Sequence, residues 1–155
     1  MIFVQEADFD GAALLANLRE QVGAQAGAIV TFTGYVRDFA PDQATETLFL
    51  EHYPGMCERE LQEIADTARE RWKLAGTVIA HRVGALSRSA QIVFVAAASA
   101  HRGDAFRGCE YMIDALKTRA PFWKRETLAN GRDFWVEARQ SDTERTQAWE
   151  SKPST

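Results

Sequence analysis

The feature that most restricts the fold of this chain is an uninterrupted apolar run over residues 92–98, with the sequence IVFVAAA. A run of this length suits one β-strand, and it is far shorter than the roughly 18 apolar residues of a membrane-spanning helix. Because successive side chains of a strand point to opposite faces of its sheet, both faces of this strand must be covered. The run therefore predicts a strand in the centre of a sheet.

Strand-like and helix-like patterns alternate around this run. Helices are expected over residues 56–74 and 104–118, and the second is expected to direct five apolar side chains inward, namely Phe106, Cys109, Met112, Ile113 and Leu116. A short turn is expected between strands at 77–83 and 91–98. A hairpin follows the second helix, with strands at 122–128 and 133–138 around an Asn130-Gly131 turn. This mixture predicts an α+β fold.

The length of 155 residues suits one domain, which we assign to residues 1–139. The remaining segment, residues 140–155, reads QSDTERTQAWESKPST and is almost entirely polar. We expect this segment to be a flexible C-terminal tail, with Trp149 as its one anchor. We also expect Trp72, Trp123 and Trp135 to pack in the core rather than to form a base-stacking platform.

The chain is acidic overall, with 18 basic and 22 acidic residues and a net charge of −4. This balance argues against a protein that coats nucleic acid, which needs a basic surface. Cys57 and Cys109 lack the spacing of a disulfide framework or a zinc site. The N-terminus, MIFVQEADFD, is unlike a signal peptide, so a cytoplasmic protein without a membrane segment is expected.

Basic residues gather in one segment, KTRAPFWKR at 117–125, which has four cations and no acid. Lys117 falls in the last turn of the expected helix, and Pro121 then leads into a strand. Lys124 and Arg125 point to opposite faces of that strand, so only one of them can share a pocket with Lys117. Two neighbouring lysines would bind an anion and lower the pKa of one amine, whereas the alternative is a helix cap followed by an exposed edge strand.

Two further segments carry cations at strand ends. His101 and Arg102 lie between the central strand and the next helix, where free backbone N–H groups favour phosphate. Arg37 follows Tyr35 and Val36 at the end of a strand that contains Gly34, a glycine that indicates a bulge or a close approach. Each segment alone is also compatible with an ordinary surface.

Taken together, these segments resemble the large catalytic subunit of molybdopterin synthase. The matching motifs are TFTGYVRD, LEHYPGM, SAHRGDAF, LKTRAPFWKRE and WVEAR, which occur in the family's order over roughly residues 2–140. The resemblance implies an α/β hammerhead-like fold with additional antiparallel β-strands. It also implies sulfur transfer to cyclic pyranopterin monophosphate (precursor Z), which forms the dithiolene of molybdopterin in molybdenum cofactor biosynthesis.

The resemblance also implies the partners. The sulfur is carried by a small ubiquitin-like subunit as a thiocarboxylate on its C-terminal Gly-Gly, and two large subunits form the central homodimer of a heterotetramer. Neither a metal nor another cofactor is implied. The family's site residues fall on Lys117 and Lys124 as catalytic lysines, and its substrate-binding positions on those two and on Tyr35, Val36, Arg37, His101, Arg102, Arg125 and Glu126. His101 and Arg102 are expected to serve the site of the neighbouring subunit.

Three alternatives remain open from the residues themselves. The chain could be a non-catalytic scaffold that docks a ubiquitin-like partner through its basic pocket. It could also bind nucleotides or RNA through the cations of residues 117–125, although these cluster at a turn rather than along a stripe. A cysteine persulfide could carry the sulfur, but Cys57 and Cys109 lie on apolar helix stripes outside the matched motifs.

Overall fold

The computed structural model describes residues 1–37, 45–136 and 139–150. These residues form four α-helices: α1 (Gly11–Val22), α2 (Met56–Trp72), α3 (Arg102–Thr118) and α4 (Gln140–Glu150). A short 3₁₀ helix, η1 (Gly23–Gln25), follows α1. No helix in the described ranges is long and apolar enough to cross a membrane.

The first sheet, which we call sheet A, has four strands in the order β1-β4-β6-β2. They are β1 (Ile2–Gln5), β2 (Ala28–Tyr35), β4 (Gly76–Arg82) and β6 (Gln91–Ser99). β1 runs parallel to β4, and the other two pairs are antiparallel. β6, which contains the apolar run, lies between β4 and β2, so the prediction of a central strand is confirmed.

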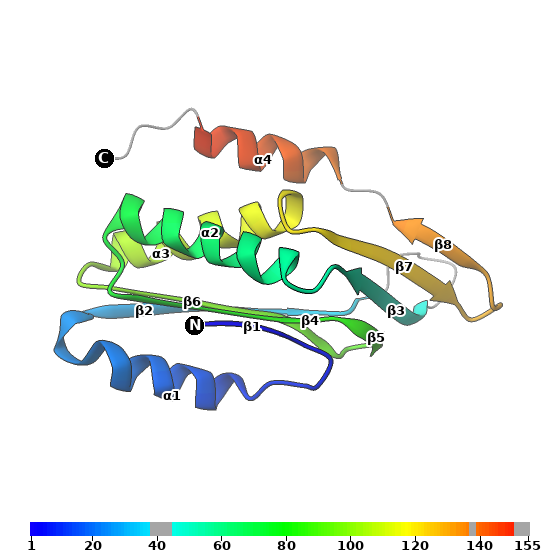
Figure 1. Ribbon diagram of the computed structural model, residues 1–155, viewed down its shortest axis with the longest axis horizontal. Helices are drawn as coiled ribbons and strands as arrows, with labels where there is room; N and C mark the ends of the chain where they lie inside the picture. The colour runs from blue at the N-terminus through cyan, green and yellow to red at the C-terminus, as the bar shows by residue number, and fades with distance from the viewer. Residues whose placement is uncertain (38–44, 137–138, 151–155) are drawn as a thin grey trace.

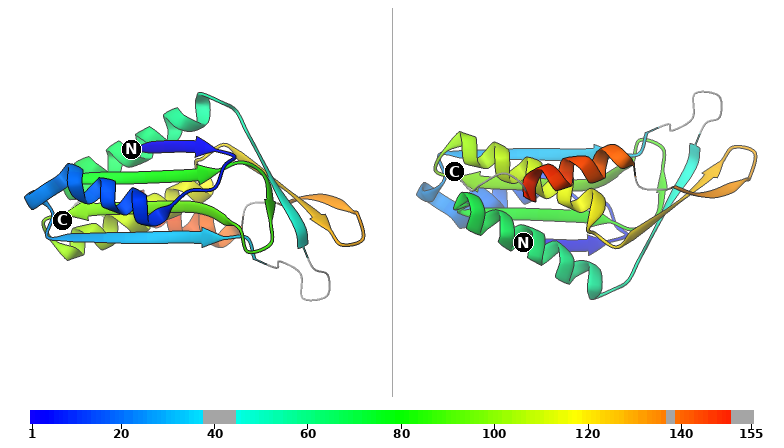
Figure 2. Two further views of the ribbon diagram at one scale, coloured as in Figure 1. Left: turned by 90° about the horizontal axis from the view of Figure 1, so that it is seen from below. Right: turned by 90° about the horizontal axis from the view of Figure 1, so that it is seen from above.

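Helices cover both faces of sheet A. Figures 1 and 2 show α1 on one face and α2 and α3 on the other, with α4 lying over α3. The alternation of side chains along the strands explains this arrangement, because Val78 and Phe94 pack towards α1 while Ile79 and Val95 pack towards α2 and α3. Both faces of the sheet therefore carry a hydrophobic core.

The second sheet, which we call sheet B, extends from one end of the molecule (Figure 1). It is fully antiparallel, with the order β5-β3-β7-β8. Its strands are β3 (Thr45–His52), β5 (Gly84–Ser87), β7 (Phe122–Leu128) and β8 (Asp133–Val136). The α+β prediction with additional antiparallel strands is confirmed, while residues 137–138 of the expected hairpin lie outside the described ranges.

One strand of sheet B was not expected. The segment after β4 was predicted to be a short turn, but β5 forms there and pairs with β3. Gly84 has a φ of 77°, which glycine adopts readily and which allows the chain to turn sharply out of sheet A. A strand of four residues is too short for its alternation pattern to be distinct, which explains the miss.

Three aromatic side chains that were predicted to be inside are exposed. Phe106 on α3 is 62% exposed, and Trp123 and Trp135 on the outer face of sheet B are 44% and 56% exposed. Side chains alternate along a strand, so β7 points every second side chain away from the core, towards the outer face of sheet B. No described helix covers that face. Trp72, by contrast, is buried as predicted.

The segment from residue 140 forms a helix, α4, so the prediction of a flexible tail is wrong for residues 140–150; residues 151–155 lie outside the described ranges. The helix is held on α3 by polar contacts around Asp114. The buried carboxylate of Asp114 accepts hydrogen bonds from Trp149 Nε1 at 2.7 Å and Arg145 Nε at 2.9 Å. Thr146 donates to the Asp114 carbonyl. Trp149 is the expected buried anchor, but a polar network completes the docking.

Candidate active site

The side chains of Lys117 and Lys124 meet where the two sheets join. Lys117 lies in the last turn of α3, and Pro121 separates that helix from β7, which carries Lys124. Both lysines line two adjoining cavities of about 120 and 220 Å³, which share Tyr35, Ile92 and Phe122 as further walls. We call these two cavities together the twin-lysine pocket. The prediction that only one of Lys124 and Arg125 shares a pocket with Lys117 is confirmed, and the residue that does so is Lys124.

The inner cavity has mainly apolar walls. Besides the lysines, His81 and Tyr35, it is lined by apolar or small residues: Phe32, Gly34, Ile92, Val93, Ile113, Leu116, Ala120 and Phe122. The register of β2 on β6 shifts at Gly34, as its glycine predicted. A Cβ atom at Gly34 would lie 2.9 Å from Val93 Cγ1, so a side chain there would press against the cavity wall. The absence of a side chain thus keeps this narrow space open.

The outer cavity is strongly charged. Arg37 and Arg139 line it beside the two lysines, and Asp142 from the first turn of α4 contributes the acidic group of this wall. Helix α4, which the sequence did not predict, therefore forms part of the site. Arg37 was predicted to be a substrate-binding residue, and the fold does bring it to the lysines.

The two lysines differ in their surroundings. Burial first, and then the nearby positive charge of Lys117, lower the pKa of the Lys124 amine to about 8. Lys124 is therefore mostly an ammonium at neutral pH, but it exchanges its proton far more readily than an exposed lysine. An amine of this kind can bind an anion and can also move a proton near neutral pH.

His81 is a polar residue of this pocket that the sequence reasoning left as a core or surface residue. Its ring is stacked on Phe122, with centroids 4.0 Å apart and planes 16° apart. Burial lowers the pKa of His81 to about 4, so the ring is neutral at pH 7. The alternation of β4 could have placed His81 on the same face as Ile79, which α2 and α3 cover, but not beside β7, which is distant in sequence.

The other two cations of the 117–125 segment are directed elsewhere. Arg119 Nη2 pairs with Glu60 of α2 at 2.7 Å. Arg125 pairs with Asp133 of β8 at 3.6 Å on the outer face of sheet B. The basic cluster seen in the sequence is thus divided among three places, and two of its members stabilise contacts between elements.

His101 and Arg102 lie at the opposite end of α3 from Lys117. At 1.5 Å per residue, the helix separates Arg102 from Lys117 by about 22 Å. Both residues are exposed, and the His101 backbone N–H donates to Ser99 Oγ at 3.4 Å. Within one chain, the fold does not bring these two predicted substrate-binding residues to the twin-lysine pocket.

The comparisons with known proteins agree on one family. The family model described as MoaE protein matches residues 4–119. The molybdopterin synthase catalytic subunit of Pseudomonas aeruginosa is 51% identical over 150 residues, which cover 96% of this chain and 98% of that protein. This chain belongs to the MoaE family.

Solved structures of MoaE relatives have the same fold. The molybdopterin cofactor biosynthesis protein E of Burkholderia multivorans superposes with a TM-score of 0.81, at 44% identity over 99% of this chain and 98% of that one. Molybdopterin synthase from Staphylococcus aureus gives a TM-score of 0.76, at 34% identity over 87% and 96% of the two chains. The hammerhead-like fold expected from the resemblance is therefore confirmed.

Of the remaining predicted positions of this MoaE chain, Tyr35 lies on the cavity walls, whereas Val36 and Glu126 do not. Tyr35 is 56% exposed and lines both cavities, but Val36 is buried against Leu48 and Leu86. The Val36 N–H donates to the Ala90 carbonyl at 2.9 Å, which fixes the strand end that carries Arg37. Glu126 is fully buried on the inner face of β7.

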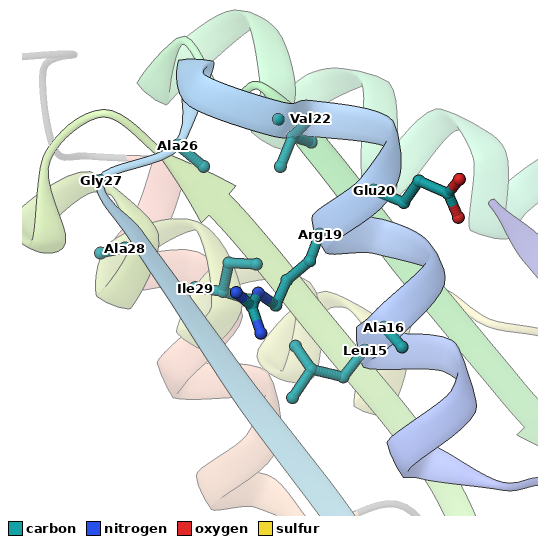
Figure 3. Close-up of a pocket in the computed structure, with 10 residues that line it drawn as sticks. Leu15, Ala16, Arg19, Glu20, Val22, Ala26, Gly27, Ala28 and Ile29 are labelled. Carbon is teal, nitrogen blue, oxygen red and sulfur yellow. The ribbon is translucent and has the colours of Figure 1, made fainter.

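A second cleft of about 730 Å³ lies between α1 and β2 (Figure 3). It is lined by the first residues of β2, whereas Tyr35 at the last residue of that strand lines the twin-lysine pocket. Its charged residues are Arg19 and Glu20, one of each sign. The cleft is larger than the twin-lysine pocket, but it does not bring like charges together as that pocket does.

The cysteines have the surroundings of inert thiols. Both Cys57 and Cys109 are buried. Burial raises the pKa of the Cys57 thiol and raises that of Cys109 to about 11, which disfavours the reactive thiolate. The described residues contain no cluster of histidine, cysteine or carboxylate side chains that could hold a metal ion.

Proposed function

We propose that this chain is the catalytic subunit of a molybdopterin synthase and that its twin-lysine pocket is the place of sulfur transfer. The reaction moves sulfur from the C-terminal thiocarboxylate of a small ubiquitin-like subunit to precursor Z and so forms the molybdopterin dithiolene. The observation that carries the proposal is that Lys117 and Lys124 both line one small, mostly apolar cavity. Membership of the MoaE family supports it.

The shape of the pocket suits the sulfur donor. The inner cavity of about 120 Å³ can accept a thin segment such as the Gly-Gly end of a protein chain, but not a bulky side chain. Within this cavity the ammonium of Lys117 meets the negative thiocarboxylate. Desolvation by the apolar walls strengthens that attraction. The outer cavity, with Arg37 and Arg139, is left for the anionic cyclic phosphate of precursor Z.

The chemistry follows from these positions. The thiocarboxylate sulfur attacks a carbon of the pterin side chain, where a carbon–sulfur bond forms and a carbon–oxygen bond breaks. The displaced oxygen leaves as water in the first addition and stays on the phosphate in the second. Each addition leaves the pterin joined through sulfur to the carbonyl carbon of the small subunit. Water then cleaves the acyl–sulfur bond, so that sulfur stays on the pterin and the small subunit leaves as a carboxylate. Lys117 stabilises the negative charge on the acyl oxygen. Lys124 and Arg37 hold the phosphate while its ring opens as the second sulfur enters.

A second copy of the chain completes this site. His101 and Arg102 are exposed and about 22 Å from Lys117 along α3, so in a single chain they cannot contact the same phosphate. In a homodimer these two residues contact the substrate in the pocket of the neighbouring subunit, and each end of the dimer takes one small subunit. The cytoplasmic location expected from the sequence stays a prediction.

The decisive experiment mixes the protein with thiocarboxylated small subunit and precursor Z and follows dithiolene formation. Wild-type protein is expected to form product, and Lys117→Ala to be at least about 100-fold slower, because it loses the charge that stabilises the acyl oxygen. Arg107→Ala is the matched control, since it removes an exposed cation from the same helix. If wild-type protein binds the small subunit but forms no product, the chain is a scaffold and the proposal is wrong.

Mixing inactive variants tests the shared site. Lys117→Ala and Arg102→Ala damage different halves of each site, so a mixed dimer contains one intact site. A one-to-one mixture is expected to recover roughly a quarter of wild-type turnover by random exchange of subunits. Each variant alone serves as the control. No recovery after verified exchange would show that each site is built within a single chain.

A further inference from the structure

Asp142 is a carboxylate in a pocket that otherwise gathers cations, and it takes no part in the proposed sulfur transfer. It lies in the first turn of α4, is half-buried, and lines the outer cavity beside Lys117, Lys124, Arg37 and Arg139. A negative group at this place repels the cyclic phosphate of precursor Z and so weakens the binding that the cations provide. Its presence therefore needs a reason of its own.

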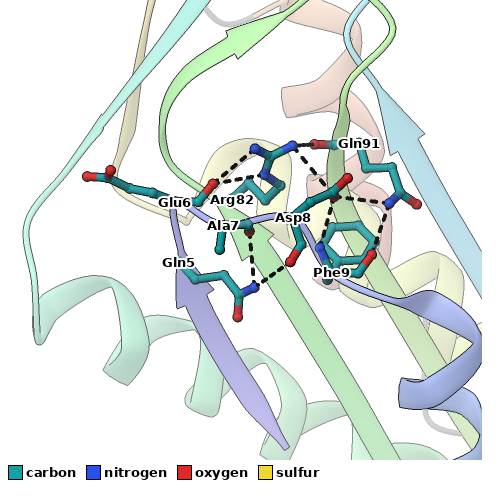
Figure 4. A network of polar contacts seen from close by, with 7 residues as sticks. All are labelled: Gln5, Glu6, Ala7, Asp8, Phe9, Arg82 and Gln91. Carbon is teal, nitrogen blue, oxygen red and sulfur yellow. Dashed lines mark hydrogen bonds and ion pairs between the residues drawn. The ribbon is translucent and has the colours of Figure 1, made fainter.

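Two other carboxylates of this chain show the contacts of an acid that stabilises the fold. Asp8 pairs with Arg82 Nη1 at 3.6 Å and accepts a hydrogen bond from Gln91 Nε2 at 3.0 Å (Figure 4). Asp114 accepts a hydrogen bond from Arg145 Nε at 2.9 Å. Each of these acids is in contact with a cation and joins separate elements of the fold.

The Asp142 carboxylate has no such partner. Among the described residues it makes no hydrogen bond and no ion pair, although four cations line the same cavity. Burial lowers the pKa of the Lys124 amine, and the charge of Asp142 partly opposes this change, so the two groups lie within electrostatic reach of one another. Both oxygens of the carboxylate therefore remain available to a ligand in the outer cavity.

Contacts of α4 hold this carboxylate at the cavity wall. The Asp142 N–H donates to the Arg139 carbonyl at 3.0 Å, which fixes the start of the helix. One turn further along α4, Thr146 Oγ1 lies 2.9 Å from Oγ1 of Thr118, the residue directly after Lys117 on α3. The first turns of α4 are thus tied to the helix end that carries a pocket lysine, so the acid and the cations keep fixed relative positions.

The pterin half of precursor Z supplies the donors that such a carboxylate binds. The pyrimidine ring of a pterin carries an amino group and an adjacent ring N–H that point in the same direction. Two parallel N–H groups match the two oxygens of a carboxylate, as they do in an arginine–carboxylate pair. The phosphate at the other end of the molecule is bound by the cations. A cavity with both signs of charge therefore suits a ligand that has a donor edge and an anionic end.

We propose that Asp142 accepts hydrogen bonds from the amino and ring N–H groups of the pterin, and so determines which end of precursor Z faces the lysines. This inference rests on the proposed function of the pocket. It adds a specificity-determining residue that neither the basic segment nor the matched motifs include. It also gives helix α4 a part in selecting a pterin over other phosphates.

Opposite effects on two ligands test this assignment. Asp142→Asn loses the charge and one of the two acceptors, so we expect Kd for precursor Z to rise about 10- to 100-fold. Kd for inorganic phosphate should fall instead, because the repulsion by the carboxylate is removed. Isothermal titration calorimetry measures both constants. Glu144→Gln is the matched control, since it removes an exposed carboxylate from the same helix, and it should change neither constant.

Turnover separates this role from that of the lysines. Asp142→Asn should raise KM for precursor Z, while kcat and KM for the small subunit stay close to wild type. If wild-type protein forms no dithiolene, the proposed function fails. The binding constants of the wild type and of Asp142→Asn would still decide whether Asp142 holds the pterin.

Three results would overturn the inference. One is an unchanged Kd for precursor Z in Asp142→Asn. Another is an equal loss of affinity for both ligands together with a fall in Tm, which would show that the carboxylate serves only to stabilise α4. The third is wild-type protein that binds precursor Z no more tightly than inorganic phosphate. Thermal unfolding of the variant and its control is therefore measured beside the titrations.

Discussion

The two sheets of this protein differ in how their faces are covered. Sheet A is covered on both faces by helices, and its strands contribute almost entirely apolar or small side chains to the two cores. Sheet B is covered on one face only, where Leu48, Leu50 and Leu86 are buried, and it exposes Trp123 and Trp135 on the other. Most of the hydrophobic stabilisation therefore comes from sheet A.

Neither sheet alone contains the candidate site. Lys117 is positioned by a helix that packs on sheet A, His81 by a strand of sheet A, and Lys124 by a strand of sheet B. The difference between the sheets shows how a pocket can hold two cations: a rigid apolar framework fixes one side, and a half-covered sheet brings a charged strand against it. Substitutions in the two regions should thus affect stability and activity separately.

The largest effect on activity is expected from Lys124→Met. It should reduce turnover by about 100-fold or more, because the twin-lysine pocket loses one of the charges that hold the anion. The same change should raise the free energy of unfolding at pH 7 by about 1–2 kcal/mol, because a desolvated charge is replaced by an apolar chain of similar length. Kinetics and chemical denaturation measure the two effects, and reduced stability with retained turnover would contradict both.

The largest effect on stability is expected from Ile79→Ala in sheet A. Ile79 is fully buried, so the truncation should lower the free energy of unfolding by about 2–5 kcal/mol, while kcat below the melting range stays close to wild type. Trp135→Ala on the open face of sheet B is the matched control, and it should cost less than about 1 kcal/mol. Equal losses in the two variants would remove the distinction between the sheets.

The next largest effect on stability is expected from a substitution in the contact between α4 and α3. Trp149→Ala removes a buried ring and its hydrogen bond to Asp114, and we expect a loss of about 3 kcal/mol in unfolding free energy together with faster proteolysis after residue 139. Gln147→Ala on the exposed side of the same helix should have no measurable effect. If Trp149→Ala leaves stability and proteolysis unchanged, α4 is not held on α3 by this network.

The pH dependence of turnover and of stability should follow the titration of the Lys124 amine. Its folded pKa of about 8 lies below the value of 10.5 for a free lysine, so the ammonium that binds the anion is lost as pH rises through about 8. Turnover should fall over that range. Stability should rise between about pH 8 and 10.5, because there the unfolded chain binds more protons than the folded one. A turnover that stays flat up to pH 10 would contradict this assignment.

The smallest effect is expected from the cysteines. The double variant Cys57→Ser, Cys109→Ser should keep wild-type sulfur transfer, since both thiols are buried and their raised pKa values disfavour the thiolate. The comparison with wild type is made below the melting range of the variant. Loss of transfer in the folded double variant would instead favour a cysteine persulfide route.

Much of the site could be predicted from one segment of sequence. The helix end at Lys117, the proline and the alternation of the following strand showed that only one of Lys124 and Arg125 could lie beside Lys117, and the family resemblance indicated Lys124. The place of His81 in the pocket could not be predicted. The residue lies 36 positions before Lys117, and local sequence patterns do not show which distant strands and helices come together. Helix α4 was missed because it is held by Asp114 and Arg145 rather than by an apolar stripe.

The position of the sulfur carrier in the complex tests the central claim most directly. A crystal structure of this chain with the small subunit is expected to show the C-terminal Gly-Gly in the inner cavity, with its terminal atoms within about 3.2 Å of the Lys117 ammonium. Lys124 should face the same end of the tail from β7. A small subunit whose C-terminus lies outside the twin-lysine pocket, for example in the cleft between α1 and β2, would contradict the account.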